Sequence, residues 1–275
     1  MSGQDGRLAP ARIPGAGPAP GAESVGAEIE LAGVRYAFGA LLALDGVDLA
    51  VPRHGRLAVV GPSGGGKSTL LGLVAGLLEP SAGSVRVGGE HDPRRRLARC
   101  ALMPQKDLLL PWRSALDNAC LALENQGLSR PDARRRARPL FERFGLGEFE
   151  RSRPDQLSGG MRQRVAFLRT LLAGKEVLLL DEPFGALDSI TRAQMQQWLA
   201  GALAAEPRTV VLVTHDVEEA LLLADLVAVL SARPGRVVRR LGVGFPRGGP
   251  RREVVSRPEF VEAKQGILES LEALE

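Results

Sequence analysis

The sequence predicts an α/β fold organised around a phosphate-binding loop. Residues 61–68 read Gly-Pro-Ser-Gly-Gly-Gly-Lys-Ser, which is a glycine, four further residues and then Gly-Lys-Ser. The short apolar run 57–60 precedes this loop and leucines at helical spacing follow it, so the loop is expected to join a strand to a helix. Near-continuous apolar runs at 177–181 and 209–214 are typical of parallel strands that helices cover on both faces.

The loop at 61–68 is suited to bind the phosphates of a nucleotide. Glycines let the backbone curl so that successive N–H groups face phosphate oxygens, and the following helix adds the positive end of its dipole. Lys67 is expected to reach the terminal phosphates, and Ser68 to ligate Mg²⁺, whose charge offsets that of the polyphosphate. The predicted nucleotide-binding residues here are Gly61, Pro62, Ser63, Gly64, Gly65, Gly66, Lys67, Ser68 and Thr69.

Two carboxylates follow the strand expected at 177–181, where a parallel sheet presents ligands to a nucleotide. Asp181 is predicted to hold the Mg²⁺ of Ser68, directly or through water. Glu182, one residue further, can lie off the metal and polarise a water for in-line attack on the terminal phosphate. The pair therefore predicts nucleotide hydrolysis.

The composition of the chain indicates the cellular environment in which nucleotide hydrolysis is expected to take place. The chain has 275 residues, of which 44% are hydrophobic and 25% charged, with a net charge of +4. No apolar run is long enough to cross a bilayer, so any membrane role is expected to come through a partner. Cys100 and Cys120 are not spaced as a metal or redox pair, and no secretory signal precedes them, which favours a reducing, cytosolic setting. Arginine clusters near 94–96, 134–136 and 239–252 are expected to be solvated faces.

The chain divides into three predicted parts. Residues 1–27 are rich in Pro, Gly and Ala without periodic apolar positions, so a disordered leader is expected; a start site placed too early would explain them equally well. Residues 28–232 form the main domain, with a helical subdomain at about 106–165, and residues 233–275 form a C-terminal extension. Strands are predicted at 29–36, 44–51, 57–60, 84–87, 177–181, 209–214 and 226–230, and helices at 114–125, 131–144, 189–204 and 258–274.

A second glycine-containing loop precedes a helix at 157–164, which reads Leu-Ser-Gly-Gly-Met-Arg-Gln-Arg. Free N–H groups at a helix N-terminus bind anions, so Ser158, Gly159 and Gly160 form another predicted phosphate site. Two such loops and one nucleotide per chain imply that this loop serves a nucleotide held by a second copy, in a head-to-tail dimer. Residues 157–163 resemble the signature motif of the ATP-binding-cassette (ABC) family.

The resemblance to the ABC family covers most of the chain and implies a P-loop NTPase fold with a mixed-sheet core, an antiparallel β subdomain and a helical subdomain. Gln105 resembles the glutamine that contacts Mg²⁺ and the attacking water and links to the helical subdomain. Asp188 resembles the loop residue that meets the partner subunit, and His215 the switch histidine that bonds the terminal phosphate. The family stacks an aromatic residue on adenine; Phe38 fits that position best, and Tyr36 stays open as the alternative.

A single cassette without membrane spans resembles the ATPase subunit of a bacterial transporter. Residues 109–113 (Leu-Leu-Pro-Trp-Arg) and 230–236 (Leu-Ser-Ala-Arg-Pro-Gly-Arg) are similar to the nitrate, sulfonate and taurine importer ATPases, and cassettes for thiamine-precursor pyrimidines share these features. The resemblance implies ATP and Mg²⁺ as cofactors and a permease docked on residues 106–112, through apolar Leu108 to Leu110. It also implies a periplasmic or lipid-anchored solute-binding protein as an indirect partner, and a cytoplasmic location on the inner face of the membrane.

Two other functions stay open. A regulatory or nucleic-acid-associated cassette would use the arginine-rich tail as its working surface, although nucleic acid is not the expected partner. A cassette that binds ATP without productive hydrolysis is disfavoured because Glu182 and His215 are both present. The transported solute cannot be read from the sequence, because a cassette of this kind does not touch it.

Overall fold

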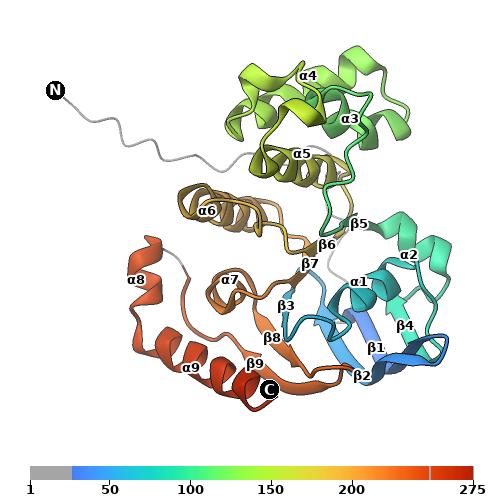
Figure 1. Ribbon diagram of the computed structural model, residues 1–275, viewed down its shortest axis with the longest axis vertical. Coiled ribbons are helices and arrows are strands. Elements are labelled where there is room, and N and C mark those ends of the chain that lie inside the picture. Colours follow the sequence, from blue (N-terminus) through green and yellow to red (C-terminus); the bar gives the residue numbers. More distant parts are fainter. Residues whose placement is uncertain (1–26, 248, 275) are drawn as a thin grey trace.

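Two β-sheets, the helices that pack on them and a separate group of helices make up the part of the chain that the computed structural model describes, residues 27–247 and 249–274 (Figure 1). The predicted leader at 1–27 lies outside these residues apart from Ala27. The predicted α/β fold, with a mixed sheet, an antiparallel part and a helical part, is confirmed by this arrangement.

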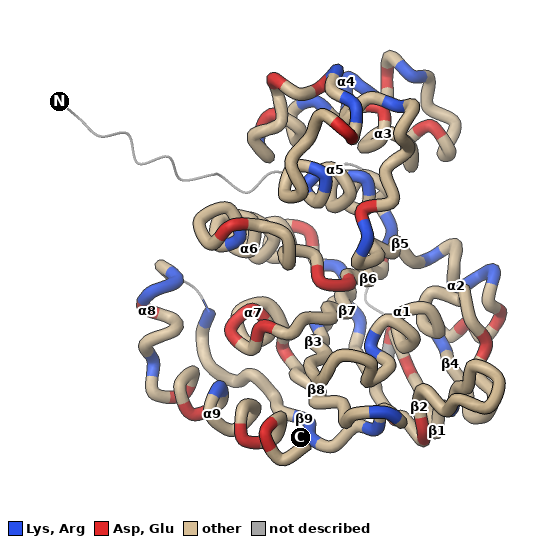
Figure 2. Tube along the Cα trace, in the orientation of Figure 1, with Lys and Arg blue, Asp and Glu red and all other residues tan. Residues whose placement is uncertain are grey.

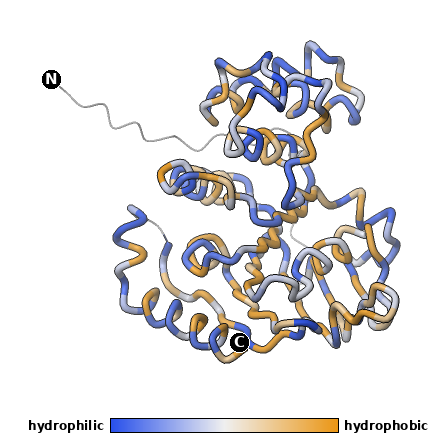
Figure 3. The backbone as a smooth tube through the Cα atoms, viewed as in Figure 1, coloured by the Kyte–Doolittle hydropathy of each residue, from blue (hydrophilic) through white to orange (hydrophobic). Residues whose placement is uncertain are grey.

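The larger sheet has six strands in the order β5-β6-β7-β3-β8-β9. Their bounds are Arg56–Val60 for β3, Cys100–Met103 for β5, Val177–Asp181 for β6, Thr209–Val213 for β7, Leu226–Leu230 for β8 and Val237–Gly242 for β9. Neighbouring strands are parallel except β8 and β9, which pair antiparallel. Every residue of β6 and β7 is buried, as expected for parallel strands covered on both faces, and Figure 3 shows hydrophobic residues along these central strands.

The smaller sheet is antiparallel, in the order β2-β1-β4. Its strands are β1 (Ala27–Phe38), β2 (Leu41–Pro52) and β4 (Ala82–Val87). Helix α1 (Lys67–Ala75) lies between the two sheets, because its leucines belong to one hydrophobic cluster with residues of β1, β2, β3 and β7. The helix is therefore apolar on more than one side, and the phosphate loop at its N-terminus lies where the two sheets meet.

The helical part stands at one end of the molecule, away from the smaller sheet (Figure 1). It comprises α3 (Ala115–Asn125), α4 (Arg130–Arg143), α5 (Gly159–Leu172) and the short 3-10 helices η1 (Gly147–Phe149) and η2 (Pro154–Gln156). Serine side chains cap the N-termini of all three α-helices, where each accepts a hydrogen bond from a backbone N–H of the first turn. Phe144 packs edge-on against Trp198 of α6 (Ser189–Ala205), with ring centroids 4.6 Å apart, and this contact joins the helical part to the rest.

Helix α2 (Pro93–Arg99) and strands β5 and β9 are not among the predicted elements. β5 is only four residues long and contains no β-branched residue, so it lacks the pattern of a strand. β9 carries Arg239 and Arg240 within an arginine-rich tail, and it forms because β8 offers a free edge for pairing. Arg239 also donates a hydrogen bond of 2.9 Å to Ser270 in the C-terminal helix α9 (Pro258–Glu272), which follows the short helix α8 (Arg251–Val255).

Arg96 contradicts the expectation that the arginine cluster at 94–96 is a solvated face. Its side chain is buried, and Nη1 donates a hydrogen bond of 2.7 Å to the carbonyl oxygen of Leu73, in the last turn of α1. That carbonyl also accepts a hydrogen bond of 3.2 Å from the N–H of Gly76, and the C-terminal end of a helix favours positive charge, which explains why an arginine is buried there. Arg94 and Arg95 are exposed, as expected.

Candidate nucleotide site

A cleft of about 440 Å³ lies where the phosphate loop, the β1–β2 hairpin and the C-terminal ends of the central strands meet. Its lining residues are Phe38, Leu41, Ala43, Ser63, Gly64, Gly66, Lys67, Ser68, Thr69, Gln105, Asp181, Glu182 and Arg233. The structure therefore brings the predicted phosphate loop, both predicted carboxylates, the predicted glutamine and the predicted aromatic residue to one cavity.

The backbone of the phosphate loop requires its glycines. Gly64 and Gly66 have φ angles of 79° and 84°, in the left-handed region that side chains disfavour. At Gly65, a Cβ atom would lie 2.7 Å from the carbonyl oxygen of Ser231, in the loop between β8 and β9. Leu230 precedes that loop, and its carbonyl oxygen would lie 2.5 Å from a Cβ at Gly61. The glycines thus allow both the curl of the loop and its close approach to the end of β8.

Lys67 begins α1 and turns back over the phosphate loop. Its Nζ donates hydrogen bonds of 2.8 Å and 2.7 Å to the carbonyl oxygens of Gly61 and Pro62. Burial lowers the pKa of Lys67, while the negative charges of Glu182 and Asp181 act in the opposite direction. The ammonium group is therefore held at the loop by carbonyls and carboxylates, within the cavity that would receive phosphates.

Asp181 ends β6 and faces Ser68 across the cleft. Burial raises the pKa of Asp181, and a hydrogen bond from the Ser68 side chain opposes that rise. A buried carboxylate, a hydroxyl and the amide oxygen of Gln105 are oxygen donors of the kind that Mg²⁺ takes alongside phosphate oxygens. These residues fit a magnesium ion that the phosphates would help to bind.

Glu182 lies in a strained backbone conformation that turns its side chain toward the cleft. Its φ of 48° is uncommon for a residue with a Cβ. The conformation is held by hydrogen bonds of 2.9 Å from its N–H to the carbonyl of Val213 and of 2.8 Å from Gln163 Nε2 to its own carbonyl. Gln163, in α5, is a positioning residue that the sequence did not single out, although it lies within the signature stretch.

The Glu182 carboxylate is contacted from two sides. Gln105 Nε2 donates a hydrogen bond of 3.2 Å to Oε2, and His215 Nδ1 lies 3.5 Å from Oε1. Gln105 follows β5 and His215 follows β7, the two strands that flank β6 in the sheet. Because parallel strands end at the same edge, three residues far apart in sequence meet at the mouth of the cleft.

Phe38 rather than Tyr36 lines the cleft. The Phe38 side chain is 52% exposed, whereas Tyr36 packs against the core beneath it, with ring centroids 4.9 Å apart and planes at 82°. An exposed aromatic face at the cavity wall suits stacking on a base, and the edge contact from Tyr36 supports the ring from behind.

The second glycine loop is not part of the cleft lining in its own chain, as far as the described residues extend. Ser158 caps α5 by accepting a hydrogen bond of 3.2 Å from the N–H of Met161, and Gly159 is exposed beside it. Gly160 lies close to the carbonyl of Ala186, in the turn that leads to Asp188. Asp188 caps α6 and is also outside the cleft lining. These residues therefore present a separate face.

The helix that follows His215 carries a buried carboxylate. Glu219, in α7 (Val217–Leu223), is 3% exposed; its Oε2 accepts a hydrogen bond of 3.4 Å from Gln196, and its Oε1 has no partner within the described residues. Burial raises the pKa of Glu219 to about 8, and the charge of Asp216 acts in the same direction. We therefore expect the carboxyl group to keep its proton in the folded protein at neutral pH.

Replacing Glu219 should change how stability depends on pH. Between the ordinary pKa of 4.5 and about 8, the folded carboxyl keeps a proton that the unfolded one loses, so the free energy of unfolding falls as pH rises. The expected slope is about 1.4 kcal/mol per pH unit. Glu219→Gln cannot ionise and should lack this loss, which thermal melts at about pH 5.5 and about pH 8 would measure. Glu262→Gln, at an exposed position of α9, is the control; parallel pH profiles for the wild type and Glu219→Gln would contradict a protonated Glu219.

Known sequences match the chain over most of its length. The profile of the family described as ABC transporter matches residues 44–185. The taurine import ATP-binding protein TauB of Rhizobium johnstonii is 42% identical over 237 residues, which cover 85% of this chain and 90% of that protein. The protein of the same name from Chromobacterium violaceum is 45% identical over 240 residues, covering 86% of this chain and 91% of that protein.

Solved structures of ABC cassettes share the fold. The dimeric structure of MJ0796, a bacterial ABC transporter cassette, has a TM-score of 0.71 at 31% identity and covers 79% of this chain and 100% of that one. The cbiO1 protein of Clostridium perfringens, part of the ABC transporter complex cbiONQ, has a TM-score of 0.69 at 23% identity, covering 89% of this chain and 97% of that one. The chain therefore belongs to the ABC transporter family, as an ATP-binding ATPase subunit.

Proposed function

We propose that the chain hydrolyses ATP to drive a bacterial ABC importer for a small solute of the taurine or sulfonate kind. The observation that carries the enzymatic part is the placement of Glu182, whose carboxylate lines the cleft of the phosphate loop between Gln105 and His215. Relatives named for taurine import support the transport part.

Two copies of the chain are proposed to enclose two ATP molecules. Ser158 and Gly159 are exposed and stand apart from the cleft of their own chain, so in this proposal they act on a nucleotide held by the second copy. A related cassette is described as a dimer in a post-hydrolysis state bound to ADP and Pi, which supports the same assembly here. Asp188 would lie near the contact between the two copies.

The proposed reaction follows from the residues of the cleft. Phe38 stacks on the adenine, and the loop N–H groups and Lys67 bind the phosphates. Glu182 accepts a hydrogen bond from the attacking water and polarises it, with Gln105 beside it, while His215 donates a hydrogen bond to the terminal phosphate. Mg²⁺, bound through Ser68, Asp181 and Gln105, would offset charge on the phosphates. Binding of ATP closes the dimer, and hydrolysis lets it reopen.

Residues 106–112 are the proposed docking surface for a membrane subunit. Within the described residues, no helix has the length and apolar content that a bilayer span requires. Leu108 and Trp112 are 60% and 71% exposed, and neighbouring apolar side chains of this kind are typical of a protein contact. Leu109, which the sequence also assigned to this surface, is buried and anchors the segment from below instead.

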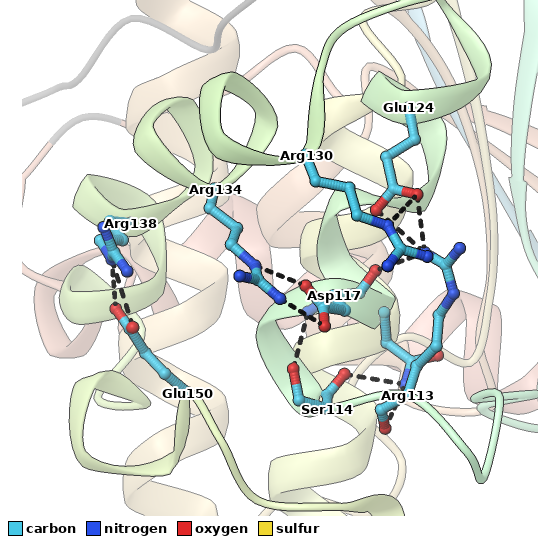
Figure 4. Close-up of polar contacts among 9 residues, drawn as sticks. Arg113, Ser114, Asp117, Glu124, Arg130, Arg134, Arg138 and Glu150 are labelled. Atoms are coloured by element: carbon cyan, nitrogen blue, oxygen red, sulfur yellow. Dashed lines mark hydrogen bonds and ion pairs between the residues drawn. The ribbon is translucent and has the colours of Figure 1, made fainter.

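Polar contacts hold the docking surface rigidly on the helical part. Asn118 of α3 accepts a hydrogen bond of 2.7 Å from the N–H of Leu110 and donates one of 3.1 Å to its carbonyl. Arg113, at the end of the segment, forms an ion pair of 2.9 Å with Glu124, as Figure 4 shows. A preorganised surface loses little entropy when a partner docks, and a movement of the partner would be passed to α3 and the rest of the helical part.

Leu108→Ser combined with Trp112→Ser should uncouple the chain from its membrane subunit. Removing two exposed apolar anchors is expected to cost about 2 kcal/mol of binding, which is roughly thirtyfold in affinity. Hydrolysis of ATP by the isolated chain should not change, because neither side chain lines the cleft. Copurification with the permease chosen from the neighbouring genes measures the effect. Unchanged copurification would contradict the proposed surface.

The arginine-rich surfaces do not favour the nucleic-acid alternative. Arg134 and Arg138 of α4 form ion pairs of 2.7 Å with Asp117 and of 3.0 Å with Glu150 (Figure 4). Figure 2 shows positive and negative residues interspersed over the helical part rather than a one-sided basic face.

The arginine-rich tail, which that alternative would use, also has paired arginines. In the tail, Arg247 forms an ion pair with Asp225, and Arg251 forms one of 2.8 Å with Glu218. Binding to a phosphate backbone needs positive charge that is not already paired, so these surfaces give no specific support to a nucleic-acid function.

The chain is proposed to lie on the cytoplasmic face of the membrane. Reconstitution with the permease and solute-binding protein of neighbouring genes tests its proposed role in transport. ATP hydrolysis by the assembled complex should rise when taurine or a related sulfonate is added, and Lys67→Ala should abolish both the basal and the stimulated rate. A complex that assembles but does not hydrolyse ATP would contradict the proposal.

A further inference from the structure

Arg233 lies in the wall of the cleft, although it belongs to none of the predicted nucleotide-binding residues. Its Nη2 would be 3.5 Å from a Cβ atom placed on Gly64, so the guanidinium group lies against the middle of the phosphate loop. The side chain is exposed toward the cavity, and no hydrogen bond or ion pair involves its guanidinium within the part of the chain that the structure describes.

The loop that carries Arg233 is firmly anchored on both sides. The N–H of Gly235 donates a hydrogen bond of 2.9 Å to Ala43, and the carbonyl of Gly235 accepts one of 3.0 Å from Asp45, both in β2. The N–H of Ser231 bonds to the carbonyl of Arg236 at 2.9 Å, which closes the loop. The fixed backbone places the Arg233 side chain at the cavity, and among the described residues no acidic group pairs with its charge.

Arg236, in the same loop, differs from Arg233 because it has an acidic partner. Arg236 forms an ion pair with Asp45, and Asp45 is also paired with Arg35 at 2.8 Å. Arg236 thus serves to attach the loop to the smaller sheet. Three residues earlier, Arg233 has a similar reach and no such acid, so its position is not explained by anchoring of the loop.

Arg233 can supply positive charge that the cleft would need to bind the phosphates of a nucleotide. Lys67 is the other cationic residue in the lining, and it faces the carboxylates of Asp181 and Glu182. A nucleoside triphosphate brings several negative charges to this place, more than one lysine and a divalent ion neutralise. A guanidinium group is planar, always charged and able to donate two parallel hydrogen bonds to one phosphate.

We propose that Arg233 is a second cationic residue that binds the phosphate chain of the nucleotide, supplied by the loop between β8 and β9. The proposal rests on the proposed ATP site and extends it by one residue. A Cβ atom at Gly64 would lie in van der Waals contact with Arg233 Nη2, at 3.5 Å, so the guanidinium lies directly beside the phosphate loop.

Calorimetric titration of the full chain with ADP and with a non-hydrolysable ATP analogue, both with Mg²⁺, tests the proposal. Arg233→Gln is expected to weaken both nucleotides about tenfold, as for the loss of one charge-assisted hydrogen-bonded contact, and Arg233→Lys should retain part of the affinity. The matched control is Arg53→Gln, in the exposed turn before β3 and outside the cleft lining. It removes the same charge and should bind like the wild type.

GDP separates a phosphate contact from a base contact. Because ADP and GDP carry the same phosphates, Arg233→Gln should weaken both by the same factor; a loss confined to ADP would overturn the assignment. Arg233→Gln that binds both nucleotides as tightly as Arg53→Gln does, with unchanged melting temperature, would also overturn it. If the proposed ATP site itself were wrong, the result would differ from both of these outcomes. The wild type would then not bind nucleotide, and Lys67→Ala would have no effect on binding.

Discussion

Glu182→Gln should reduce ATP hydrolysis by about 10²- to 10⁴-fold while ATP binding is retained. The amide keeps the size of the side chain and its contacts with Gln105 and His215 can persist, but it cannot draw a proton from the attacking water. Since reopening of the dimer is proposed to need hydrolysis, the variant should accumulate as an ATP-bound dimer. Steady-state phosphate release gives the rate, and size-exclusion chromatography with ATP gives the oligomeric state.

Glu262→Gln is the matched control, because the same change is made on an exposed position of α9, outside the cleft lining. It should hydrolyse ATP at the wild-type rate. A Glu182→Gln variant that also does so would show that another group activates the water, and the assignment of Glu182 would be wrong.

Gly159→Glu should abolish hydrolysis, by at least about 100-fold, without harming its own chain. A Cβ atom at Gly159 would have its nearest contact at 3.9 Å, from the flexible Arg162 side chain, so the position accepts a larger residue. Gly159 is the first residue of α5, where a negative charge is favourable to the helix. Melting temperature should therefore stay the same or rise. Activity falls because the same charge would face the phosphates held by the second copy.

Gly159→Ala is the control for the size of the side chain, since it adds a methyl group but no charge and leaves the N–H in place. It should lose much less activity than Gly159→Glu. Full activity in Gly159→Glu would mean that this loop does not meet a nucleotide at all.

The parts of the site that are continuous in sequence are the ones that the sequence predicts well. The curl of residues 61–68 depends on its own glycines, and Asp181 and Glu182 end a strand whose apolar residues make it recognisable. The family resemblance implied that Gln105 and His215 act at the same site as Glu182. The order of the parallel strands, which the structure adds, explains how they converge on it.

Contacts that form only when distant segments of the chain pack together could not be predicted from the sequence. Arg233 reaches the phosphate loop because β8 lies next to β3 and β9 turns back beside it, and β9 has no strand pattern of its own. Leu109 is buried although its neighbour Leu108 is exposed, which depends on how the segment rests on α3. Arg96 is buried because the end of α1 offers a carbonyl group, and a cluster of arginines in the sequence gives no sign of it.

Each ATP is proposed to be enclosed by the phosphate loop of one copy and residues 158–160 of the other. Mixing two inactive chains tests it directly. A dimer of one Lys67→Ala chain with one Gly159→Glu chain contains one site in which both changes meet and one site that neither change touches. Each variant alone is expected to be inactive, and the mixture is expected to regain ATP hydrolysis. A mixture as inactive as its components, with mixed dimers shown to form, would contradict this shared arrangement of the site.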